Sequence, residues 1–181
     1  MPASHDAKLL LAMSRGDETA ARTLHARVGP RLAAYTRAFL RNDAAADDVI
    51  QQTWLRAVSR SPDELARIDD ALAWLIRIAR SIALNTLRAR SRASATERQH
   101  AAMNGSKPGP APTDSASLHA AVERLSDDHR ELILLKHIAD LTFDQIALTL
   151  GENRSTIASR YRAAMDALRS HLQPNREAAH A

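Results

Sequence analysis

The sequence predicts an all-α protein with two small helical domains joined by a flexible linker, the C-terminal domain carrying a helix-turn-helix. Glycine is scarce, with 5 residues among 181, while Ala, Leu and Arg recur at helical spacing without alternating Val, Ile and Thr. One internal segment is rich in Pro, Gly and small polar residues, and a helix, a tight turn and a second helix follow it. We therefore expect a domain over 1–93, a linker over 94–117, a second domain over 118–173 and a tail over 174–181.

Five helices are expected in the first domain, with bounds near 7–14, 19–28, 30–40, 45–59 and 70–92. Asp17 or Thr19 is suited to cap the second helix. Gly29-Pro30 is expected to end that helix, because Pro fits the first turn of the next one. Ser61-Pro62-Asp63 is expected to end the fourth helix, before the last helix of this domain begins.

The fourth and fifth of these helices differ in character. The fourth has an apolar stripe of Val49, Ile50, Thr53, Trp54 and Ala57, and the surrounding segment 43–70 is acidic. On the fifth, the side expected to be buried holds Leu72, Leu75, Ile76, Ala79, Ile82, Ala83 and Leu87. The opposite side holds Trp74, Arg77, Ser81, Asn85, Arg88 and Arg92. Arg tracks phosphates and an amide can pair with a base, so this side fits DNA; a solvated charged face with a core Trp is the alternative.

The linker and the start of the second domain differ in composition. Residues 94–117 hold three of the seven prolines and two of the five glycines, too little apolar surface for a core. Ser126 then caps a helix with Asp127 and Asp128 in its first turn. Its buried side is expected to be Leu132, Ile133, Leu135 and Ile138.

Residues 141–172 indicate a helix-turn-helix DNA reader. Thr142 and Gln145 form a capping box, and Gly151 ends that helix in a left-handed backbone. The first helix should bury Phe143, Ile146, Ala147 and Leu150, and the second Ile157, Tyr161, Ala164, Met165, Leu168 and Leu172. Asn153 or Ser155 caps the second helix, whose N-terminal polar residues are where this motif meets base edges and phosphates. An ordinary helical hairpin with a solvated face is the alternative.

Composition excludes several classes. The chain has no cysteine, and no apolar run approaches the roughly 20 residues of a membrane span, so we expect a cytoplasmic protein without membrane insertion. Phosphate loops, HExxH, GxSxG and metal-ligand clusters are missing, and lone histidines such as His129 and His137 lack ligand spacing. We expect no enzyme activity, cofactor or metal. Arg makes up 22 of the 25 basic residues, which suits phosphate contacts but also follows from a GC-rich genome.

Three segments in order resemble a bacterial RNA polymerase sigma factor of the extracytoplasmic-function (ECF) class. They are AADDVIQQTWLRAV, AWLIRIARSIALNTLRARSR and the stretch from LSDDHREL to DALRSHL. The resemblance implies helical regions two and four, which bind core RNA polymerase and promoter DNA and begin melting. It also implies an anti-sigma protein as a candidate partner that wedges between the domains. A stand-alone helix-turn-helix regulator is the alternative, but it leaves the first two segments unexplained; an enzyme or a structural adaptor fits less well.

The resemblance assigns roles residue by residue. Polymerase docking is assigned to Asp47, Asp48, Val49, Gln51, Gln52 and Trp54. Contact with the minus-ten element is assigned to Trp74, Arg77, Arg80, Ser81, Asn85, Arg88 and Arg92. Contact with the minus-thirty-five element is assigned to Arg154, Ser155, Thr156, Ser159, Arg160 and Arg162. Ser81, Asn85 and Ala158 depart from residues common in the family, which affects promoter sequence rather than docking. An extruded base is expected to enter a pocket between the fifth helix and the loop 61–70.

Overall fold

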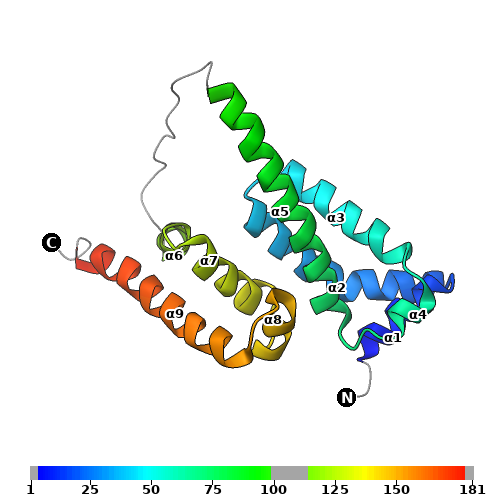
Figure 1. The fold of residues 1–181 in the computed structure, drawn as a ribbon. Helices are drawn as coiled ribbons and strands as arrows, with labels where there is room; N and C mark the ends of the chain where they lie inside the picture. Colours follow the sequence, from blue (N-terminus) through cyan, green and yellow to red (C-terminus); the bar gives the residue numbers. More distant parts are fainter. Residues whose placement is uncertain (1–3, 99–113, 178–181) are drawn as a thin grey trace.

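The computed structural model describes residues 4–98 and 114–177, which form helices and no strands, so the all-α prediction is confirmed (Figure 1). The N-terminal half contains α1 (His5–Ser14), α2 (Glu18–Leu40), α3 (Asp43–Val58), α4 (Pro62–Leu65) and α5 (Ala71–Arg98). The C-terminal half contains α6 (Asp114–Glu123), α7 (Asp127–Ile133), the π-helical turn η1 (Leu134–Ile138), α8 (Phe143–Leu150) and α9 (Arg154–Glu177). Within the described residues, no helix is both long and apolar enough to cross a membrane.

Side-chain caps start most of these helices where short polar residues precede an apolar run. Asp17 accepts a hydrogen bond from the backbone N–H of Ala20 at 2.9 Å, as predicted. Asn42 does the same for α3. These bonds satisfy donors that a helix leaves unpaired in its first turn.

The predicted helix break at Gly29-Pro30 is wrong, because α2 runs through Pro30 without interruption. Pro removes one backbone bond and crowds the preceding turn, at a cost of about 3 kcal/mol. The buried stripe of α2 continues on both sides of Pro30, through Leu24, Val28, Leu32 and Tyr35. Packing of this stripe therefore offsets the local preference of Pro.

The ordered helices extend into three segments expected to be irregular. The short helix α4 occupies part of the predicted break and is held by a capping box between Ser61 and Glu64. Helix α5 continues to Arg98 and α6 begins at Asp114, so both ends of the predicted linker 94–117 are helical. The Pro- and Gly-rich remainder, 99–113, lies outside the described residues. Helix α9 reaches Glu177, into the predicted tail 174–181.

The helix-turn-helix has the predicted local structure. Ser126 caps α7, Thr142 and Gln145 form the capping box of α8, and Gly151 has φ +71° at its C-terminus. The sequence did not predict η1, in which the N–H of Ala139 donates to the carbonyl of Leu134, five residues back. Asp140 follows with φ +53°, which turns the chain toward α8.

The two halves pack against each other. One apolar cluster includes Leu32, Leu75 and Ile76 from the N-terminal half together with Leu135 and Ile146 from the C-terminal half. Helix α2 contacts η1, and α5 contacts α8. A smaller cluster joins α6, α7 and α9 within the C-terminal half. Two residues predicted to be buried, Leu87 and Ile138, are instead 37% and 40% exposed.

Candidate functional site

The first candidate surface is the outer side of α3, called here the α3 face. Asp47, Asp48, Gln51 and Gln52 are exposed on it. Gln51 and Gln52 each follow one of the two acids by four residues, which places the four side chains on one side of the helix. Asp47 pairs with Arg37 of α2 at 2.9 Å, which fixes the acidic end of the face. The face thus presents carboxylates and amides to a partner.

Two residues assigned to docking lie elsewhere. Val49 is only 1% exposed, so it packs α3 onto the core and cannot contact a partner directly in this arrangement. Trp54 is half-buried, and its ring centroid lies 5.2 Å from that of His25. Its indole N–H is buried without a hydrogen-bond partner among the described residues. Leu55 was not predicted as part of this surface, yet it is 58% exposed and continues the α3 face four residues after Gln51.

The second surface is the outer side of α5, called the α5 face. Arg77, Ser81, Asn85 and Arg88 are exposed in a row along it, while Trp74 is half-buried at its start. Arg92, also exposed, extends the row. The Arg88 guanidinium donates to the Asn85 side-chain oxygen at 3.1 Å. This contact orients both groups outward, so a cation and an amide are presented together.

A cavity of about 190 Å³ opens at the N-terminal end of the α5 face. It lies where the sequence predicted a pocket, between the loop after α4 and α5. Its lining also includes two residues of α8, which the sequence did not predict. The lining residues are Arg67, Ile68, Asp69, Asp70, Ala73, Trp74, Arg77, Leu148 and Thr149.

Arg80 does not point outward with the other residues assigned to the minus-ten element. Its Nε and Nη2 atoms donate to the two carboxylate oxygens of Glu131 at 2.6 and 3.0 Å. This bidentate bond to Glu131 raises the pKa of Arg80. Arg80 therefore joins α5 to α7 in this arrangement. The two residues lie 51 positions apart, so no local pattern could have indicated the pair.

The third surface is the N-terminal part of α9, called the α9 face. Arg154, Ser155, Thr156, Ser159 and Arg162 are exposed there, and Ile157 is fully buried beneath them. Arg154 pairs with Asp144 of α8 at 3.1 Å. The free N–H groups of a helix start and the exposed hydroxyls suit phosphate and base-edge contacts.

Arg160 lies on the flank of this face and is held by two acids. It is bonded to Glu152 and lies 3.6 Å from Asp128. The hydrogen bond that Arg160 donates to the Glu152 carboxylate raises the pKa of Arg160. Its guanidinium thus supports the turn before α9, and the other five predicted residues form the open part of the face.

Family models match both halves of the chain. The model of sigma-70 region 2 matches residues 24–93, which include the α3 and α5 faces, and that of sigma-70 region 4 matches residues 115–168, which include the α9 face. Among curated relatives, the ECF RNA polymerase sigma factor SigC of Mycobacterium tuberculosis is 30% identical over 141 residues, covering 76% of each chain. The sigma factor CarQ of Myxococcus xanthus is 27% identical, covering 87% of this chain and 91% of its own.

Solved structures share the fold. The sigma factor RpoE of Bartonella quintana, in complex with the anti-sigma factor NepR, has a TM-score of 0.68 at 24% identity, over 84% of this chain and 96% of its own. CnrH, in complex with the cytosolic domain of CnrY, has the same score and identity over 94% and 99%. The matches to the sigma-70 region 2 and region 4 models and to SigC define a promoter-specificity subunit. The chain belongs to the ECF RNA polymerase sigma factors, which direct promoter recognition with RNA polymerase.

Proposed function

We propose that the three faces divide the work of transcription initiation. The α3 face docks on core RNA polymerase, the α5 face meets the minus-ten element and starts melting, and the α9 face reads the minus-thirty-five element. The chain acts in the cytoplasm and carries out no chemistry of its own. One observation carries this proposal: most of the residues assigned to the three contacts lie exposed on three separate helices, and the opposite sides of these helices form the core.

Melting follows from binding energy in this proposal. Extruding a base from the duplex costs a few kcal/mol, which a protein offsets by holding the base in a pocket. The cavity beside Trp74 and Arg77 supports such a role, because it pairs an aromatic wall with a cation at the start of the α5 face. Asn85 and Arg88 then contact the neighbouring strand.

Reconstituted transcription tests the proposal. Core polymerase is assayed with and without the chain, and transcript starts are sequenced. We expect new starts that depend on the chain, and fewer of them with Arg88→Ala. Arg22→Ala should cause no change, because Arg22 is exposed on α2 and pairs with Glu18 one turn away. Core polymerase retained by the chain in a pull-down should be equal for all three proteins. An absence of chain-dependent starts, or a loss of polymerase by Arg88→Ala, would contradict these roles.

We also propose that an anti-sigma protein docks in a groove between the two halves. The groove has a volume of about 780 Å³ and a mainly apolar lining from α2, α6, α7, η1 and α9. Its Arg and acidic lining residues are Arg37, Arg41 and Arg130 against Glu123, an excess of cations that favours a helix apolar on one side and acidic on the other. NepR and CnrY each form a complex with a protein that shares this fold, which supports an anti-sigma protein as the partner.

A designed helical peptide probes the groove. A fluorescent peptide with Leu on one side and Glu on the other should bind the full chain, measured by anisotropy, and a version with Lys in place of Glu should not. Leu118→Arg, at a residue 47% exposed in the groove, should weaken the Glu peptide. Equal binding of both peptides, or no effect of Leu118→Arg, would contradict this docking site.

A further inference from the structure

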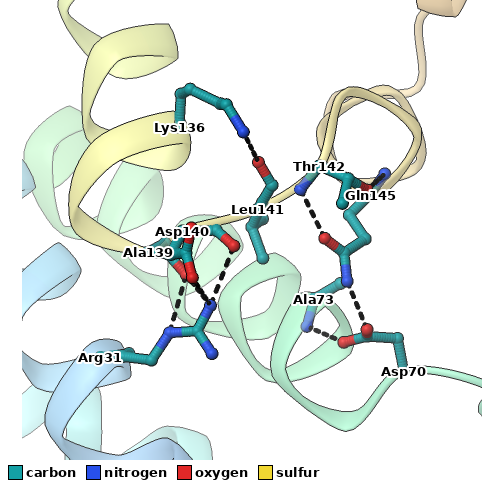
Figure 2. A network of polar contacts seen from close by, with 9 residues as sticks. All are labelled: Arg31, Asp70, Ala73, Lys136, Ala139, Asp140, Leu141, Thr142 and Gln145. Carbon is teal, nitrogen blue, oxygen red and sulfur yellow. Dashed lines mark hydrogen bonds and ion pairs between the residues drawn. The ribbon is translucent and has the colours of Figure 1, made fainter. Parts of the chain in front are cut away.

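The two halves cap the ends of each other's helices. Arg31 of α2 donates to the carbonyl of Ala139 at 3.0 and 2.6 Å and to that of Asp140 at 2.9 Å, at the end of η1 (Figure 2). In the opposite direction, Arg130 of α7 donates to the carbonyls of Ala38 and Phe39 at 2.5 and 3.0 Å, at the end of α2. Carbonyls at these positions lack partners within their own helix, and cations are favoured there.

Glu131 of α7 accepts its side-chain hydrogen bonds from residues of the N-terminal half. Its carboxylate, whose side chain is 10% exposed, accepts both bonds from Arg80 of α5 and one from the Tyr35 hydroxyl of α2 at 3.3 Å. A buried carboxylate is tolerated only when such donors surround it. The side chain of Glu131 is therefore matched to the N-terminal half rather than to its own half.

A third contact lies beside the cavity. Asp70 caps the start of α5 through the N–H of Ala73 at 2.7 Å, and its second oxygen accepts a bond from Gln145 of α8 (Figure 2). This bond holds α8 against α5, where Leu148 and Thr149 close one side of the cavity. A base entering the cavity would have to share it with α8.

In this arrangement the α5 face and the α9 face lie too close together to contact both promoter elements at the same time. Arg154 follows Thr149 by five residues, so the start of the α9 face lies within about 18 Å of the cavity wall. The two promoter elements, by their names, are separated by roughly 25 base pairs, or about 85 Å of B-DNA. A chain segment as long as 99–113 reaches at most about 50 Å, and α5 itself adds about 40 Å, so separation of the halves can supply the distance.

We propose that these cross-contacts form an autoinhibitory latch, made by Arg31, Arg80, Glu131 and Arg130, which the chain must open before it can bind a promoter. This inference rests on the proposed roles of the α5 and α9 faces. Opening frees Arg80 for the α5 face and removes α8 from the cavity. Closure is then a cost on promoter binding, because the apparent affinity for the promoter falls with the fraction of open chain.

Energy transfer measures opening directly. The chain has no cysteine, so Val58→Cys and Ser170→Cys, at exposed positions in opposite halves, place one dye pair on the full-length protein. Two variants weaken the latch: Glu131→Gln removes the buried charge, and Arg31→Ala removes donors from a half-exposed position that takes no part in the three faces. Asp166→Asn and Arg22→Ala make the same charge changes at exposed ion pairs within one helix.

We expect the open-to-closed ratio to rise roughly tenfold or more in each weakened variant, a change equivalent to about 1.4 kcal/mol. Transcription at limiting sigma factor should rise with the open fraction, while both controls match wild type. Circular dichroism checks that each variant is folded. If Glu131→Gln does not fold, the result with Arg31→Ala alone tests the latch.

Three results would overturn the latch: wild type already in the low-transfer state, unchanged transfer in a folded weakened variant, or opening without a gain in transcription. Wild type that produces no chain-dependent starts would instead refute the proposed function, and the energy-transfer signal would still report on the contact.

Discussion

Replacing Gly151 by Ala tests whether the turn between α8 and α9 depends on its left-handed backbone. Gly151 has φ +71°, and a Cβ added there meets nothing within 4 Å, so the cost is one of backbone conformation alone. For an L-residue that cost is about 1–2 kcal/mol. Gly29 is a contrasting position inside α2, where Ala is favoured by about 0.5–1 kcal/mol, but it precedes Pro30, whose ring crowds the Cβ of a preceding helical residue and offsets that gain. Its added Cβ would lie 3.4 Å from the exposed His25 ring, which can move aside.

The same substitution should therefore have different effects at the two positions. We expect Gly151→Ala to lower the free energy of unfolding by about 1–2 kcal/mol and Gly29→Ala to leave it nearly unchanged. Urea unfolding followed by circular dichroism gives both values, and an unchanged m-value shows that the comparison is valid. Gly151→Asn should recover part of the loss, since Asn tolerates this backbone region. Equal effects of Ala at both positions would refute the conformational reasoning.

Further tests address the faces and the core. Asn85→Ala should reduce promoter opening, measured by permanganate reactivity of unpaired thymines, without changing core polymerase affinity. Leu55→Asp should weaken polymerase binding in a pull-down but change the free energy of unfolding by no more than about 0.5 kcal/mol, because the side chain is 58% exposed. Thr156→Ala should weaken binding of a minus-thirty-five duplex, measured by anisotropy. Burial, together with Glu131, raises the pKa of Tyr35. The Tyr35 hydroxyl therefore stays protonated in the folded chain at a pH near 10, where it loses its proton in the unfolded chain. Unfolding free energy should thus fall as pH rises above about 10, and Tyr35→Phe should remove this loss.

Local features of this chain could be predicted because their causes are local. The cap at Asp17, the capping box that starts at Thr142 and the left-handed Gly151 each depend on a few neighbouring residues. The exposed rows on α5 and α9 followed from helical periodicity, which places polar residues opposite a buried stripe.

Features that depend on long-range packing could not be predicted. Pro30 was expected to end a helix, yet the buried stripe around it continues into the shared core. Arg80 was placed with the outward residues, but its partner Glu131 lies in the other half. Periodicity identifies which side of a helix is polar, and it does not identify which polar residue finds a partner 51 positions away.

The chain's two tryptophans give polymerase docking and DNA strand capture separate fluorescence signals. Trp54 stands on the helix of the α3 face, and Trp74 lines the cavity of the α5 face. With Trp74→Phe, indole emission would report arrival of the polymerase. With Trp54→Phe, quenching by stacked bases would report strand capture. The order of the two events could then be read in one stopped-flow experiment without any added dye.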